Sequence, residues 1–93
     1  MIANSMVTVE IDCALDRMQL PLAEAIIHAW EILSRLPLGE GQLKDLGVYF
    51  GLGAEQRILN EIARAGTDER YFLLHGELRS VQISLAPAPP AAR

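Results

Sequence analysis

The stretch LKDLGVYFGLGAEQRILNEIARAG, residues 43–66, decides the fold that we expect for this chain. Its second half places apolar residues at the spacing of one helix face: Ile58, Leu59, Ile62 and Ala65. We therefore predict a helix from Ala54 to Ala65 that is buried along this face. Gly66 follows it, in the position where a left-handed residue commonly ends a helix.

A second, shorter helix is predicted just before the first, from Gln42 to Phe50. Gly51 and Gly53 separate the two helices and permit a sharp corner between them. We expect Leu52, which lies between these glycines, to point inward as a plug. Two helices that cross through a short turn of this kind form a helix-turn-helix.

Two strand signals follow, over residues 71–74 and 79–85, and the second alternates apolar and polar residues. We place a two-residue type II′ turn at Gly76 and Glu77, which pairs Phe72 with Val81 in a hairpin. One face of this hairpin should join the core, and it carries Phe72, Leu74, Val81 and Ile83.

The N-terminal segment from Met6 to Cys13 also alternates, which is the period of a half-buried strand. We expect it to join either the hairpin of its own chain or the same strand of a second subunit, and we favour a role in dimerisation. The residues expected on its apolar face are Val7, Val9, Ile11 and Cys13.

Pro21 suits the first turn of a helix and Pro37 cannot continue one, so residues 21–36 are predicted to be helical. Trp30 is expected to anchor the core. The broad apolar face of this helix is formed by Leu22, Ile26, Ala29, Trp30 and Leu33, and it is widened by Ile27.

The chain has 93 residues, of which 51% are apolar, and this suffices for one small domain. We expect an N-terminal strand and connector at 1–20, a compact domain at 21–85 and a disordered Pro/Ala tail at 86–93. Cys13 is the single cysteine, so no intramolecular disulfide can form, and a reducing cytoplasm is the expected location. The sequence carries no secretion signal and no apolar run long enough to cross a membrane.

Taken together, the segments resemble the winged helix-turn-helix superfamily. LKDLGVYFGLGAEQRILNEIARAG is similar to its helix-turn-helix, and RYFLLHGELRSVQISL is similar to its two-stranded wing. The resemblance covers residues 21–85 and implies an α+β fold, a winged helix of three helices and a C-terminal two-stranded wing, here with an additional N-terminal strand. It implies a small transcriptional regulator that binds double-stranded DNA as a homodimer.

In that superfamily the second helix of the motif enters the major groove and the wing contacts the backbone or minor groove. Gln, Arg and Asn side chains can read base edges, and they occur on the outward face of the predicted 54–65 helix. The residues that the resemblance assigns to DNA contact are Lys44, Gln56, Arg57, Asn60, Arg64, His75 and Arg79.

The charge balance favours an alternative. The net charge is −4, which opposes binding to a polyanion, and Glu55, Glu61 and Glu77 lie among the candidate DNA contacts. The alternative function is a protein-protein interaction module, an accessory or antiactivator subunit without direct DNA binding, which would use an apolar surface to hold its partner.

The sequence contains no pattern that predicts an enzyme, a cofactor or a metal site. Cys13 is expected to be inert packing, and Asp68 with Glu69 is interpreted as a solvated connector. Glu24 and His28 lie four residues apart on one predicted helix face, a spacing that is far commoner for a surface pair than for metal ligands.

Overall fold

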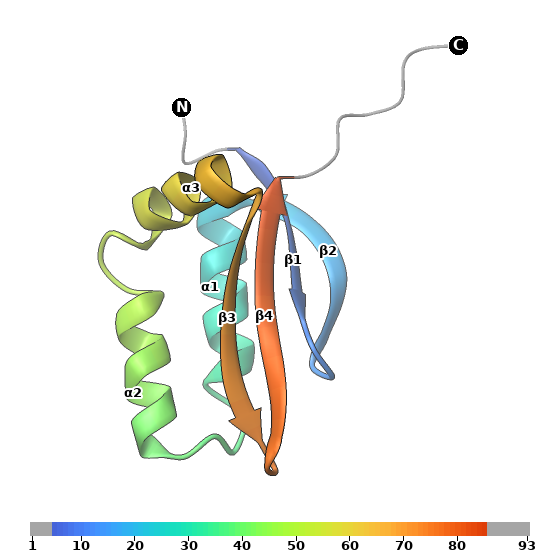
Figure 1. The fold of residues 1–93 in the computed structure, drawn as a ribbon, viewed down its shortest axis with the longest axis vertical. Helices are drawn as coiled ribbons and strands as arrows, with labels where there is room; N and C mark the ends of the chain where they lie inside the picture. Colours follow the sequence, from blue (N-terminus) through green and yellow to red (C-terminus); the bar gives the residue numbers. More distant parts are fainter. Residues whose placement is uncertain (1–4, 86–93) are drawn as a thin grey trace.

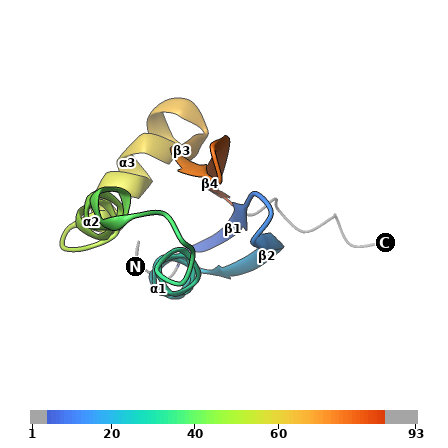
Figure 2. The ribbon, with the colours of Figure 1, turned by 90° about the horizontal axis from the view of Figure 1, so that it is seen from below.

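A four-stranded antiparallel sheet forms one layer of the molecule, and three helices pack on one of its faces (Figure 1, Figure 2). This computed structural model describes residues 5–85, and the predicted disordered tail at 86–93 lies outside them. The elements follow the chain in the order β1 (Met6–Ile11), β2 (Leu15–Pro21), α1 (Leu22–Leu33), α2 (Glu40–Tyr49), α3 (Ala54–Ala65), β3 (Thr67–Leu74) and β4 (Glu77–Leu85).

The prediction of a winged helix with a separate two-stranded wing is wrong. The strands lie in the order β2-β1-β4-β3, so the two expected wing strands are half of one continuous sheet. The N-terminal strand β1 pairs with β4 over five residue pairs and is a central strand. Its backbone groups are therefore satisfied from both sides within the chain, which removes the reason for assigning this strand to dimerisation.

The strand β2 was not predicted from the sequence. A β-bulge interrupts its pairing with β1 between Val9 and Ile11, so that Val9 pairs with Met18 whereas Ile11 pairs with Leu15. Leu15 and Met18 are three residues apart, and this odd spacing hides the strand from a search for alternation.

Cys13 does not lie in a strand. The strand β1 ends at Ile11, and Cys13 is exposed in the following turn with a φ of 64°. The expectation that its thiol faces the core is therefore wrong. The other three apolar residues assigned to that face, Val7, Val9 and Ile11, are buried as predicted.

The turn between β3 and β4 falls one residue earlier than expected. His75 and Gly76 form it, and both have positive φ, at 53° and 79°. This is the type I′ pattern, which suits a two-residue hairpin loop. Phe72 consequently pairs with Arg79 and not with Val81. Because the register differs by two residues, the faces are unchanged and Phe72 and Val81 are both buried.

The helix α3 has the predicted bounds, and Gly66 ends it in the left-handed conformation. Two inferences about neighbouring side chains are wrong. Leu52 is 99% exposed and is no plug, since Phe50 and Ala54 on either side of the turn are buried instead. Ile27 is 59% exposed and lies outside the apolar face of α1.

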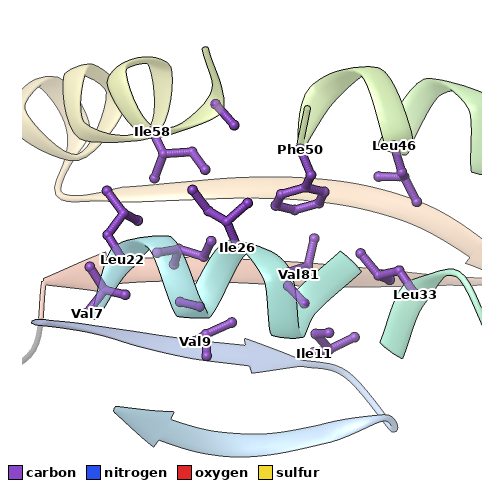
Figure 3. Packing of buried hydrophobic residues seen from close by; sticks show 14 of the residues in the cluster. Val7, Val9, Ile11, Leu22, Ile26, Leu33, Leu46, Phe50, Ile58 and Val81 are labelled. Atoms are coloured by element: carbon purple, nitrogen blue, oxygen red, sulfur yellow. The ribbon is translucent and has the colours of Figure 1, made fainter. Parts of the chain in front are cut away.

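The core lies between the helices and the sheet (Figure 3). The fully buried Ile58 of α3 and Leu22 of α1 face strand residues such as Val7. Trp30 is only partly buried and packs at the rim, where it lies against Gly47 of α2. A Cβ on Gly47 would come within 3.3 Å of the Trp30 ring, so glycine allows the close approach of α1 and α2.

Replacing Ile58 by alanine should lower the free energy of unfolding by about 2–5 kcal/mol, because it leaves a cavity in the centre of this core. The matched change Leu52→Ala should alter it by less than about 0.5 kcal/mol, since that side chain has almost no neighbours to lose. Urea denaturation followed by circular dichroism measures both values. Equal losses in the two variants would contradict this description of the core.

Candidate interaction surfaces

The residues that the sequence assigned to DNA contact are divided among three elements. Four of them lie on α3, Lys44 lies on α2, and His75 and Arg79 belong to the β3-β4 hairpin. All of them except Arg79 are exposed, and Lys44 and His75 make no side-chain hydrogen bond or ion pair within residues 5–85. The remaining five are engaged in contacts within the chain, and these contacts determine how much of each side chain is free to meet a ligand.

Arg57 holds the end of α2 and the turn that follows it. Its guanidinium donates hydrogen bonds to the carbonyl oxygens of Leu52, at 3.0 Å, of Val48, at 3.5 Å, and of Tyr49. The carbonyls at a helix C-terminus have no partner within the helix and carry partial negative charge, which a cation satisfies. Arg57 also lies over the ring of Tyr49, 5.5 Å from its centre.

The other assigned polar residues are paired as well. On α3, Gln56 donates a hydrogen bond to Asn60 at 3.0 Å, and Arg64 forms an ion pair with Glu61. In the hairpin, Arg79 is paired with Glu77. Each pair would have to break, at least in part, before its members could contact a base or a phosphate.

A polar cluster beside α3 was not predicted from the sequence. Tyr49 donates a hydrogen bond to the carboxylate of Asp68, and the guanidinium of Arg70 lies 4.0 Å from the centre of the Tyr49 ring. The cluster opens into a hollow of about 430 Å³ lined by Tyr49, Arg57, Asn60, Glu61, Asp68, Glu69 and Arg70. Three carboxylates against two guanidinium groups leave this hollow slightly acidic, which is unfavourable for a phosphate backbone.

Asp68 was interpreted as part of a solvated connector, and this is wrong. It lies in β3 and is buried, on the same face as Arg70 and Phe72. These three residues stand at every second position, which is the period of a strand and could have predicted that β3 begins earlier. The pattern was not recognised because Asp and Arg rarely lie on a core-facing side.

Burial raises the pKa of the Asp68 carboxyl above its ordinary value of 3.8, although the hydrogen bond from Tyr49 and the charge of Arg70 act in the opposite direction. Burial and the adjacent Asp68 raise the pKa of the Tyr49 hydroxyl well above its ordinary value of 10.0. Tyr49 therefore stays a neutral hydrogen-bond donor at physiological pH.

The exposed apolar side chains of the hairpin form the most conspicuous surface feature. Tyr71 and Leu73 of β3 and Leu78 of β4 are 59%, 52% and 63% exposed, and Leu73 pairs directly with Leu78. We call these three residues the hairpin patch. They point away from the core-facing side of β3, and the helices lie on the other side of the sheet (Figure 2).

A side chain of α2 fixes the backbone beneath this patch. Gln42 accepts a hydrogen bond from the Leu73 amide at 2.7 Å and donates one to the Leu73 carbonyl at 2.8 Å. Its amide thus pairs with the edge of β3 in the manner of a neighbouring strand. The hairpin patch is consequently held on a rigid support and is not a loose loop.

The fold and these surfaces define an α+β domain with an open sheet face. No known protein family, no curated protein and no solved structure matches the chain. Within residues 5–85, no helix is both long and apolar enough to cross a membrane. Over the same residues, no three His, Cys, Asp or Glu side chains gather in a way that could hold a metal ion.

The raised pKa of Asp68 predicts a pH dependence of stability. A carboxyl with a raised pKa binds its proton more tightly in the folded state, so its stabilising contribution is present below pH 3.8 and is lost as the pH rises through the raised value. Relative to Asp68→Asn, whose amide oxygen can still accept from Tyr49, the wild type should lose stability as the pH rises from below 3.8 through the raised pKa of Asp68. Urea denaturation across this range measures the difference, and a constant difference would contradict it.

Removing the Gln42 side chain should release the edge of β3. Gln42→Ala should cost about 1–2 kcal/mol of stability, because it deletes two hydrogen bonds to the Leu73 peptide. It should also speed hydrogen exchange of the Leu73 amide, as measured by NMR. The control is Gln56→Ala, which breaks only an exposed contact with Asn60, and exchange at Leu73 should be unchanged in that variant.

Proposed function

We propose that this chain is a protein-protein interaction domain that holds its partner through the hairpin patch. The observation that carries the proposal is the direct pairing of Leu73 with Leu78 on the uncovered face of the sheet, next to Tyr71, with all three side chains more than half exposed. Contiguous exposed apolar side chains on a rigid support are typical of binding surfaces, and tyrosine is enriched in such surfaces.

The chemistry of the hairpin patch suits a partner that buries apolar surface. Tyr71 combines a large ring with a hydroxyl that donates to Glu69 at 2.9 Å, so its polar end is already satisfied. Glu69 in turn accepts a hydrogen bond from Gln82 at 2.7 Å, which gives the patch a polar border. An apolar centre with a polar border is the usual arrangement of a specific protein interface.

The same contacts make DNA a weaker candidate partner. Arg57 is occupied by the carbonyls at the end of α2, and Arg64 and Arg79 are paired with carboxylates. Affinity for DNA comes chiefly from cations that neutralise phosphates, and a net charge of −4 opposes that attraction. We therefore favour a protein partner over an operator site.

The test compares two double variants in extracts of the native host. The tagged wild type should retain a protein partner at a fixed stoichiometry, and Leu73→Ser with Leu78→Ser should lose it, because the variant removes the apolar centre of the patch. The matched control is Val48→Ser with Leu52→Ser, which removes two apolar side chains elsewhere that are even more exposed, at 70% and 99%. This control should retain the partner.

Two further measurements complete the test. Analytical ultracentrifugation shows whether the partner is a second copy, in which case the hairpin variant alone should become monomeric. Fluorescence anisotropy against genomic fragments at rising salt tests the DNA alternative. A sequence-specific DNA complex, or a partner lost equally from both double variants, would overturn the proposal.

A further inference from the structure

Within residues 5–85, the sheet has a second unpaired edge, on β2, at the opposite end of the strand order from β3. The direction of its backbone groups follows from one hydrogen bond, in which the Leu22 amide donates to the Ser5 carbonyl at 2.8 Å. In an antiparallel pair, bonded positions alternate along the strand, here as far as Met18, where the β-bulge begins. Leu20 and Met18 therefore bond to β1, whereas the amide and carbonyl of Gln19 point outward from the sheet.

A hollow of about 320 Å³ accompanies this edge on the helical side of the sheet. Its floor is apolar and consists of Met18 and Leu20 of β2 and the exposed Ile27 of α1. Its rim is a stripe along α1 whose members are three or four residues apart: Glu24, His28 and Glu31. Both features lie side by side because the chain passes directly from β2 into α1 (Figure 1).

The charge of the rim decides between two kinds of occupant. A second copy would pair through a two-fold axis, and the same acidic stripe of α1 would then face itself. Glu24 and Glu31 would approach carboxylates of like charge, which costs free energy. A strand that brings lysine or arginine to the rim would be attracted instead.

We propose that the edge of β2 and the acidic stripe of α1 form a binding site for an extended basic segment of another protein, which adds to the sheet as a fifth strand. The outward amide and carbonyl of Gln19 supply main-chain hydrogen bonds. The floor of Met18, Leu20 and Ile27 takes the apolar part of the inward side chains. This site is separate from the hairpin patch and goes beyond the proposed function. Its test does not depend on whether the hairpin patch binds a partner.

The distance between Glu24 and Glu31 on the rim determines how far apart the basic residues of the bound segment should be. Glu24 and Glu31 are seven residues apart on α1, or about 10.5 Å along the helix. In a strand, inward-facing residues four positions apart are separated by about 13 Å, and flexible lysine stems can cover the difference. The expected pattern is basic, apolar, basic at every second position, with small polar residues between them.

The experiment uses the peptide Thr-Lys-Thr-Val-Thr-Lys-Thr and its counterpart with glutamate in place of both lysines. NMR hydrogen exchange of the full chain reports binding at single amides. The lysine peptide should protect the amide of Gln19, whereas those of Glu69 and Tyr71, which point outward from the other edge, should stay unprotected. The glutamate peptide should bind about tenfold more weakly, because two attractive charge pairs become repulsive.

Variants separate the backbone contribution from the charge contribution. Gln19→Pro should abolish binding because it removes an outward amide without breaking the ladder to β1, and Glu69→Pro is the matched change on the opposite edge and should leave binding intact. Glu24→Lys combined with Glu31→Lys should reverse the preference, so that the glutamate peptide binds more tightly.

Three outcomes would overturn the inference. The first is a lack of protection at Gln19 with saturating lysine peptide. The second is equal affinity of the wild type for the two peptides. The third is protection of the Gln19 amide without peptide that grows with chain concentration, which would show that a second copy covers the edge. None of these results bears on the hairpin patch.

Discussion

The pairing of β1 with β4 is the constraint on which the rest of the structure depends. It joins the first strand of the described chain to the last, and it places Val7, Val9 and Ile11 fully under the helices. Each strand hairpin alone would have one apolar face and two open edges, which is marginal in water. Their union gives a sheet wide enough to bury α1 and α3 together, and it leaves only β2 and β3 with free edges.

Several polar side chains of the domain attach α2 to the neighbouring helix α3 and strand β3. Arg57 satisfies the carbonyls at the end of α2, Gln42 pairs with the edge of β3, and Tyr49 binds the buried carboxylate of Asp68. These contacts connect α2, which shares only a few contacts with α1, to α3 and β3. Arg57, one of the residues that suggested recognition of bases, therefore attaches α2 to α3.

The remaining surfaces differ in chemistry because different elements cover the two sheet edges. At β3, α2 lies close enough for Gln42 to occupy part of the edge, and the exposed apolar residues lie on the outer face. At β2, the neighbouring helix α1 stands beside the edge and contributes acidic side chains. Two surfaces of the kind proposed here would allow the chain to bring two partners together.

The sequence allowed the local elements to be predicted where the periodicity was strong. The bounds of α3, its left-handed end at Gly66 and the burial of Val7, Val9 and Ile11 on β1 were correct. The prediction failed where a local irregularity changed the period. The bulge near Val9 concealed β2, and the left-handed conformation of the non-glycine residue His75 moved the hairpin turn by one position.

The positions of the helices and the acidic balance were determined by the sequence alone, because spacing and composition act within a few residues of the chain. Only the tertiary structure decided that the first strand joins the last, that Ile27 and Leu52 are exposed to solvent, and that Arg57 binds the carbonyl oxygens at the end of α2. Pairing between distant strands depends on which edges remain unsatisfied after the whole chain has collapsed. No local pattern contains that information.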